Sequence, residues 1–235
     1  MKTLLLLLQI LLTGWALDST AFSQTMIARF DAAKDNTLFE NPTGAFSNGA
    51  GEYLFAGRTA RTISGGEIRR GLIAFSLSDR LPVGSTILSA SLTLYLSQAN
   101  ENSGDQPISL HRALSDWGAG ESDSTSIGGG GSGALAEPGD ATWLHTFSDI
   151  DLWNRPGGDF FPTDSATSTI GTDAGAFHWS SPGMTNDVQE WVDRPTENFG
   201  WLLLGHEADR LTARRFNSSS HSNPATRPEL RIEYL

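Results

Sequence analysis

Three tryptophans stand beside polar residues in segments rich in glycine, serine and acidic residues, a combination suited to binding sugars. Trp117 follows Asp116, Trp153 comes shortly before Arg155, and Trp179 has polar residues on both sides. The apolar face of a sugar ring stacks on an indole, while carboxylate and guanidinium groups hydrogen-bond to its hydroxyls. We therefore expect Trp117, Trp153, Asp116, Arg155 and Trp179 to bind a ligand, with Trp117 and Trp153 partly exposed on loops.

An alternative for Trp117 and Trp153 is that both indoles fill gaps beneath long loops. Trp191 and Trp201 lie in apolar periodic runs and are expected in the core. Trp143 alternates with polar neighbours, a pattern that fits a position in the core and a position at the surface equally well.

The loops also carry many carboxylates, which are the ligands that calcium prefers. Asp140, Glu121 and Asp123 are the candidate ligands of a structural calcium ion. No contiguous calcium-binding loop is present, so the competing interpretation is that these carboxylates are solvated and maintain solubility. The five histidines are scattered at spacings that match no recognised transition-metal site.

Catalytic motifs are missing. The chain holds no Gly-x-Ser-x-Gly pentapeptide, and His206-Glu207 is followed by Arg210 where a zinc protease has its second histidine. The glycine tract at 128–133 lacks the Lys-Ser/Thr ending of a phosphate-binding loop. Acidic pairs are too common here to identify a glycosidase. We expect a protein that is not an enzyme and requires no cofactor.

The N-terminus has the pattern of a secretory signal peptide: Lys2, an apolar run over 4–12, and small residues at Ala21 and Ser23. The run is too short to span a bilayer, and no second one follows. We expect cleavage near Ser23, an extracellular protein without a membrane span, and one domain over residues 24–235. The chain has no cysteine, so stability must come from packing.

The formal charge of -11 argues against binding nucleic acid, which requires neutralising phosphates with Lys and Arg. The expected partner is a polysaccharide or cell-surface glycan, or else the protein itself or another extracellular protein.

Period-2 alternation between turn residues predicts an all-β fold, a two-sheet antiparallel sandwich with long loops. In the clearest strand, 91–96, Leu92, Leu94 and Leu96 share one face. Further strands are expected at 71–77, 108–113, 142–147, 199–204 and 230–234, a surface loop at 127–136, and one short helix at 184–193. The shared core is expected to contain Leu72, Phe75, Leu92, Leu94, Leu202, Leu204, Leu230 and Ile232.

Several stretches occur in the order seen in a known family: 34–40 (KDNTLFE), 69–77 (RRGLIAFSL), 81–94 (LPVGSTILSASLTL), 116–121 (DWGAGE), 139–143 (GDATW), 187–191 (DVQEW), 198–203 (NFGWLL), 215–218 (RFNS) and 227–230 (RPEL). They resemble the DNRLRE-domain proteins, which are similar to the carbohydrate-binding modules found beside polysaccharide lyases. The resemblance implies a jelly-roll-like sandwich exported from the cell, and hence a secreted, non-catalytic glycan-binding module. The alternative is an extracellular structural or adhesion subunit that self-associates.

Overall fold

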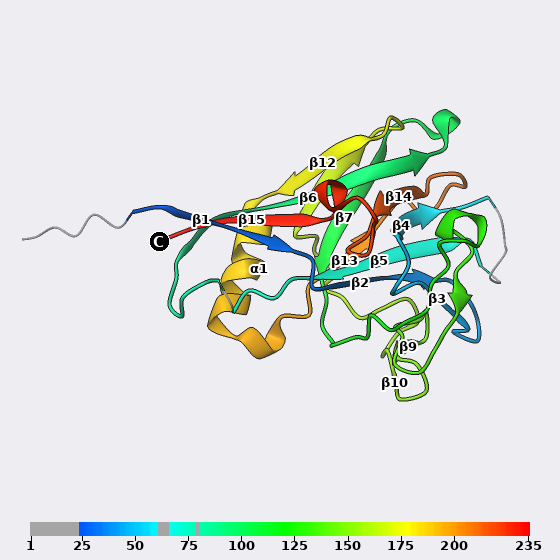
Figure 1. The fold of residues 1–235 in the computed structure, drawn as a ribbon, viewed down its shortest axis with the longest axis horizontal. Helices are drawn as coiled ribbons and strands as arrows, with labels where there is room; N and C mark the ends of the chain where they lie inside the picture. Colours follow the sequence, from blue (N-terminus) through cyan, green and yellow to red (C-terminus); the bar gives the residue numbers. More distant parts are fainter. Residues whose placement is uncertain (1–23, 61–65, 79) are drawn as a thin grey trace, which may run out of the picture.

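The computed structural model describes residues 24–60, 66–78 and 80–235, so the expected signal peptide lies outside the described residues. Its strands are β1 (Met26–Asp31), β2 (Lys34–Phe39), β3 (Phe46–Ser47), β4 (Tyr53–Arg58), β5 (Ile68–Ala74), β6 (Ile87–Ala99), β7 (Gln106–Arg112), β8 (Ala134–Leu135), β9 (His145–Phe147), β10 (Asp151–Leu152), β11 (Ala166–Ile170), β12 (Gly175–Ser180), β13 (Trp201–Leu204), β14 (Arg214–Asn217) and β15 (Glu229–Tyr234). The α-helix is α1 (Pro182–Asp193), and four short 3-10 turns lie in the loops. The fold is all-β, as the alternation predicts (Figure 1).

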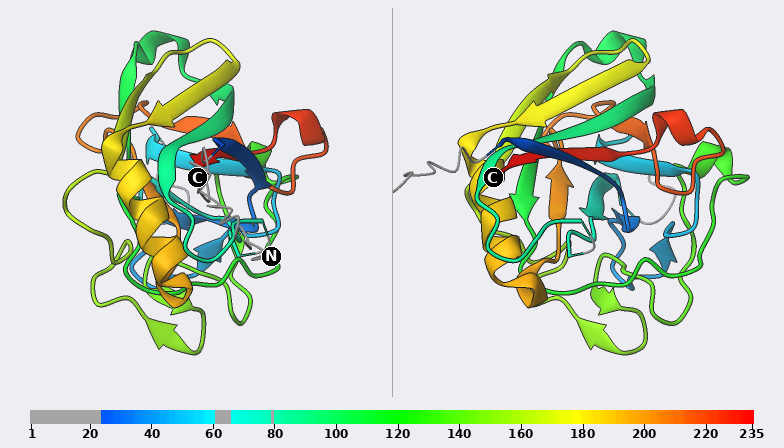
Figure 2. Two further views of the ribbon diagram at one scale, coloured as in Figure 1. Left: turned by 90° about the vertical axis from the view of Figure 1, so that its left-hand side faces the viewer. Right: turned by 60° about the vertical axis from the view of Figure 1, so that its left-hand side comes forward.

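The main sheet has the strand order β1-β15-β6-β14-β4-β5-β13-β7-β11, with β12 beside β6 and β2 beside β5. All of these pairs are antiparallel. The sheet curls at β4, which joins β14 on one side and β5 on the other, so that its two halves face each other like a sandwich (Figure 2).

The space between the halves is filled by the main hydrophobic cluster, called here the inner core. Leu92, Leu94 and Leu96 enter it from β6, while Thr93 and Tyr95 on the opposite face are partly exposed. The period-2 prediction for this strand is therefore confirmed. Strand β6 extends beyond 91–96 at both ends, and its alternation of buried and partly exposed residues runs from Ala90 to Leu96.

A second hydrophobic cluster lies on the outer face of β2, β5 and β13 and is called here the loop-covered core. It consists of Leu38, Leu72, Ala74, Trp117, Ala141, Trp153 and Leu202. The prediction that Leu72, Leu202 and Leu204 belong to the shared core is wrong, because Leu72 and Leu202 are buried in the loop-covered core and Leu204 is partly buried against it. Leu72 and Leu202 face outward from their strands. They alternate with Ile73 and Leu203, which face the inner core instead.

Helix α1 lies against one end of the folded sheet (Figure 2). It begins after Ser181, whose hydroxyl accepts a hydrogen bond from the Met184 N–H, a standard N-cap. Met184, Val188 and Trp191 form its buried face and join the inner core. The helix predicted at 184–193 is confirmed, with two more residues at its start. No helix in the described part of the chain is long and apolar enough to cross a membrane.

The strand expected at 142–147 shrinks to β9, because residues before His145 turn back through the Thr142 side chain. The 127–136 segment is a loop as expected, with the two-residue strand β8 near its end. Gly129 and Gly130 in this loop have positive φ, and a Cβ at Gly130 would come 3.3 Å from the Phe55 ring.

Candidate functional site

Trp117 lies in the loop after β7 and is 0% exposed. Its Nε1–H donates to the Phe199 carbonyl at 2.8 Å. The Lys34 ammonium lies 4.4 Å from the centre of the indole ring and donates to Asp116 Oδ1 at 2.7 Å. The expected exposure of Trp117 is therefore wrong, and Asp116 is engaged in an ion pair with the chain's own lysine.

Trp153 and Trp179 are also buried, at 5% and 1% exposure. The Trp153 Nε1–H donates to the Thr142 carbonyl, and that of Trp179 to the Ile108 carbonyl, both at 2.8 Å. The prediction of an exposed indole platform is wrong for all three residues. Trp191 and Trp201, expected in the core, are buried there.

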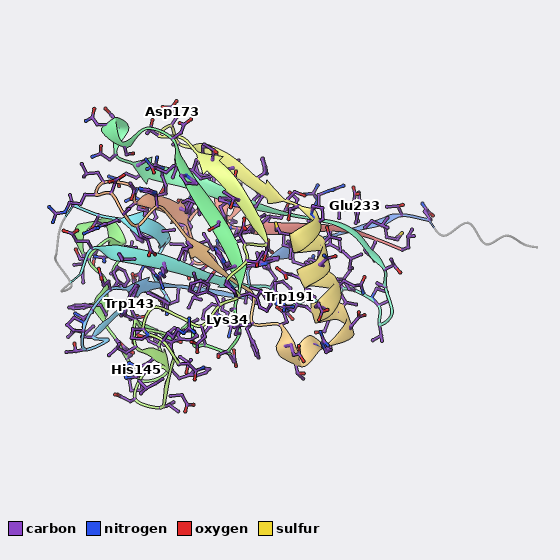
Figure 3. The ribbon with its side chains drawn as sticks, turned by 180° about the vertical axis from the view of Figure 1, so that it is seen from behind. Lys34, Trp143, His145, Asp173, Trp191 and Glu233 are labelled. Atoms are coloured by element: carbon purple, nitrogen blue, oxygen red, sulfur yellow. The ribbon has the colours of Figure 1, made fainter. Side chains whose placement is uncertain are left out.

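The physical reason lies in the sheet beneath the loops. Leu38, Leu72 and Leu202 point outward from β2, β5 and β13, and this apolar surface must be covered. Trp117 and Trp153 reach back from the loops to cover it, while Trp143 packs at its edge and stays partly exposed. Trp143 lies among these loops in Figure 3.

The three candidate calcium ligands occupy different environments. Asp140 is buried, with Oδ2 accepting the Glu137 N–H at 2.8 Å and Oδ1 left without a partner. That oxygen lies against Gly120, where φ is +74° and a Cβ would come 1.3 Å from it. Glu121 and Asp123 are exposed, and Asp123 accepts the Thr125 N–H. Among residues 24–60, 66–78 and 80–235 no three His, Asp or Glu side chains are grouped to hold a metal. Calcium binding stays a prediction.

Arg155 lines a surface hollow with a volume of about 500 Å³. We call this hollow the Arg155 groove. It is lined by Arg70, Leu114, Ser115, Asn154, Arg155, Pro156, Gly158, Asp159, Phe160 and Pro162.

The buried carboxylate of Asp159 shapes one wall of the groove. Its Oδ2 accepts the backbone N–H of Asn154 at 2.8 Å and the Asn154 Nδ2 at 2.9 Å, and its Oδ1 accepts the Arg155 N–H at 3.1 Å. The turn at 154–159 is therefore closed on its own aspartate. Because its oxygens are used in this way, Asp159 is a structural group.

Arg70, on β5, holds the same turn from the sheet. Its guanidinium makes a bidentate ion pair with Glu207, with distances of 2.7 and 2.9 Å, and donates to the Gly157 carbonyl at 2.8 Å. Its centre lies 4.9 Å from the Trp143 ring centre and 5.6 Å from that of Phe160. This bidentate geometry is the strong form of an arginine contact.

Arg155 itself is exposed, and its guanidinium makes no hydrogen bond or ion pair with any described residue. The side-chain nitrogen of the neighbouring Asn154 donates a hydrogen bond to Asp159, and its side-chain oxygen remains available as an acceptor. Phe160 and the 48% exposed Leu114 supply apolar surface. The groove therefore presents the Arg155 guanidinium, the Asn154 side-chain oxygen and two apolar side chains. This combination is suited to binding an anionic ring compound.

Of the five residues expected to bind ligand, only Arg155 lines this groove. Arg70, Leu114 and Phe160 were missed. One signal was available in the pair Arg69-Arg70, which interrupts an otherwise apolar strand and therefore requires partners.

One further buried group titrates unusually. Burial raises the pKa of Asp35, on β2, from 3.8 to about 6, although its Oδ2 accepts the Ser219 N–H at 2.6 Å. This carboxylate ties β2 to the loop after β14.

No protein-family model matches this chain, and no curated protein is significantly similar to it. The resemblance to DNRLRE-domain proteins therefore stays a prediction.

Proposed function

We propose that the protein is a secreted, non-catalytic module that recognises a polysaccharide through the Arg155 groove, and that the preferred sugar carries a carboxylate. The observation that supports this most directly is the exposed Arg155 guanidinium, which has no partner in the described chain and stands beside Asn154 and Phe160.

A planar guanidinium pairs with a carboxylate through two parallel hydrogen bonds. Phe160 and Leu114 would contact the apolar face of the same sugar, and the Asn154 oxygen would accept from a hydroxyl. The groove is pre-organised by Asp159 and Arg70, so little ordering is required on binding. The charge of -11 opposes an anionic ligand at long range, so recognition depends on this local contact.

The test is calorimetric titration with an oligouronate and with a neutral oligosaccharide of equal length. We expect the oligouronate to bind more tightly. Arg155→Ala should weaken its binding about tenfold to a hundredfold, as expected for a lost charge-assisted contact. The affinity of Arg155→Lys for the oligouronate should lie between those of the wild-type protein and Arg155→Ala, because an ammonium cannot form two parallel hydrogen bonds with a carboxylate.

Arg194→Ala is the matched control, since Arg194 is also exposed but pairs with Glu190 and Glu197 at the end of α1. It should leave binding unchanged. Equal affinity of wild type and Arg155→Ala would contradict the groove as the site, and absence of binding to any uronate or neutral glycan would contradict the function.

A second candidate function, self-association as an extracellular structural or adhesion subunit, is favoured by strand β1. It pairs with β15 along one edge, and no other described strand pairs with its other edge. Met26 and Ile27 on this strand are 49% and 54% exposed. A free edge with apolar side chains is a template for pairing with another chain.

Light scattering across a concentration series tests this candidate. If copies pair through β1, the mass should rise with concentration, and Ile27→Lys should return it to that of a monomer. Val83→Lys, at a fully exposed valine outside the strands, is the control. A constant monomer mass for the wild-type protein would contradict self-association.

A further inference from the structure

A second hollow, of about 240 Å³, is formed by the end of β7, the 161–165 segment and the first turns of α1. We call it the Arg112 hollow. Polar and aromatic side chains line it, among them Arg112, Phe161, Asn186 and Asp187. Its volume is below the range of a complete small-molecule site, which favours a part of a larger ligand.

The Arg112 hollow and the Arg155 groove follow each other along one pair of backbone segments. The Phe161 N–H donates to the Arg112 carbonyl at 2.9 Å, and the Leu114 N–H donates to the Asp159 carbonyl at 3.0 Å. Arg112 and Phe161 line the hollow, whereas Leu114 and Asp159 line the groove. Positions 112 and 114 are at most about 7 Å apart along the chain. Linked sugars that occupy the groove can therefore extend into the hollow.

The Arg112 guanidinium makes no hydrogen bond to any described residue. Its centre lies 5.1 Å from the centre of the Phe161 ring, and it faces carboxylate oxygens of Asp187 and Glu190 at 3.9 and 4.0 Å. The Arg112 side chain is 26% exposed, and each of its nitrogens keeps some accessible surface. Its N–H groups are therefore available to a ligand.

Asp187 provides an acceptor beside this donor. Its Oδ2 accepts from the Trp201 Nε1–H at 2.8 Å and from the Ser165 hydroxyl, which fixes the carboxylate in place. Its Oδ1 accepts no hydrogen bond from a described residue, keeps some accessible surface and lies 3.9 Å from Arg112 Nε. A hydroxyl oxygen about 2.7 Å from the carboxylate and about 2.9 Å from the nitrogen would bridge this gap. A sugar hydroxyl, which both donates and accepts, fits this position.

Phe161 supplies apolar surface next to these polar groups. Its side chain is 44% exposed, and its backbone is fixed by its hydrogen bond to Arg112. The apolar face of a sugar ring can pack on it. The hollow is also lined by three acidic residues, Asp164, Asp187 and Glu190, against one basic residue. Like charges placed together are unfavourable, so the hollow favours a neutral sugar over an anionic one.

We propose that the Arg112 hollow binds a neutral sugar next to the uronate in the Arg155 groove, so that the ligand is a polysaccharide in which uronic acids are linked to neutral sugars. A hydroxyl of the neutral sugar bridges Arg112 and Asp187, and its ring packs on Phe161. This inference rests on the proposed function, because the groove must hold the uronate. A polymer of uronic acid alone would place a carboxylate beside Asp187 and is discriminated against.

Calorimetric titration compares a hyaluronan tetrasaccharide, in which glucuronate alternates with a neutral N-acetylated sugar, with tetragalacturonate, which carries a carboxylate on every ring. We expect the alternating tetrasaccharide to bind the wild-type protein about tenfold more tightly. Phe161→Ala and Arg112→Gln should each weaken its binding about tenfold and change the affinity for tetragalacturonate less than about twofold.

Each variant has a matched control. Arg231 also lies on a strand, has 32% of its side chain exposed and lines neither hollow nor groove, so Arg231→Gln controls for Arg112→Gln. Ile150 is 69% exposed and lines neither of them, so Ile150→Ala controls for Phe161→Ala. Both controls should bind the two tetrasaccharides as the wild-type protein does.

A preference for the alternating tetrasaccharide that Phe161→Ala and Arg112→Gln both remove supports the proposal. Equal or weaker binding of the alternating tetrasaccharide would overturn it, and so would an equal loss of both ligands in the two variants. If tetragalacturonate still binds through Arg155 in those cases, the proposed function stands and only this inference fails. Absence of binding to either tetrasaccharide would overturn this inference and count against the proposed function as well.

Discussion

The two faces of the β5–β13 layer differ in how they are covered. Its inner face, with Ile73 and Leu203, packs against the opposite half of the sheet. Its outer face, with Leu72 and Leu202, is covered only by loops that contribute Trp117 and Trp153. Strand β6, by contrast, alternates between buried leucines and partly exposed polar residues. A strand that is apolar on both faces requires cover on both, and here loops provide it.

This difference explains why Trp117 and Trp153 are buried although they lie in loops. An indole in a Gly- and Asp-rich loop resembles a binding residue when the loop is considered alone. When the loop lies over an unprotected apolar face, burying the indole is the largest gain available to it.

The largest expected effect tests whether the loop-covered core stabilises the protein as a true core does. Trp117→Ala removes a buried indole and its hydrogen bond to Phe199. The free energy of unfolding should fall by about 3 to 5 kcal/mol. Guanidinium denaturation measures this. A loss below about 1 kcal/mol would mean that the loops contribute little and that the comparison between the faces fails.

Leu94→Ala makes the corresponding change in the inner core, where Leu94 is 0% exposed. The expected loss is roughly 2 to 5 kcal/mol from the same measurement, as is usual for a large buried aliphatic group. Retained stability would place the main core elsewhere.

Asp35 contributes a pH dependence, because its folded pKa of about 6 is above its ordinary value of 3.8. The unfolded chain releases this proton first as pH rises, so stability should fall between about pH 4 and 6, by up to about 3 kcal/mol. Asp35→Asn keeps an acceptor for the Ser219 N–H and should lose this dependence. Denaturation curves at several pH values test it; identical pH profiles for the two proteins would contradict the raised pKa.

The smallest expected effect compares two indoles of the inner core. Trp179→Phe removes a hydrogen bond to Ile108, whereas Trp191→Phe removes an N–H that has no partner. In the absence of added ligand, Trp179→Phe should cost about 1 kcal/mol more than Trp191→Phe. Thermal unfolding of the two variants gives the difference. A larger loss for Trp191→Phe would indicate that its N–H is satisfied in solution.

Local patterns in the sequence were sufficient for several elements. The alternation of Leu92, Leu94 and Leu96 determined which face of β6 is buried, since side chains alternate across a strand. The apolar face of α1 and the stop at Pro195 determined the helix. The continuous apolar runs in β5 and β13 also carried the information that both faces are buried, although they were interpreted as contributing to a single shared core.

Only the tertiary structure decided the positions of the loops and hence the candidate site. Whether Trp117 covers Leu202 depends on which strands are neighbours, and that pairing joins residues far apart in the chain. The same holds for the Arg155 groove, where Arg70 of β5 meets Gly157 across 87 positions. Side-chain periodicity indicates which face of its own strand or helix a residue occupies. The burial of a loop residue depends instead on the surface that the loop covers. For this protein, the residues alone determined the fold class and the phase of its clearest strand, and long-range pairing determined which side chains are available to a ligand.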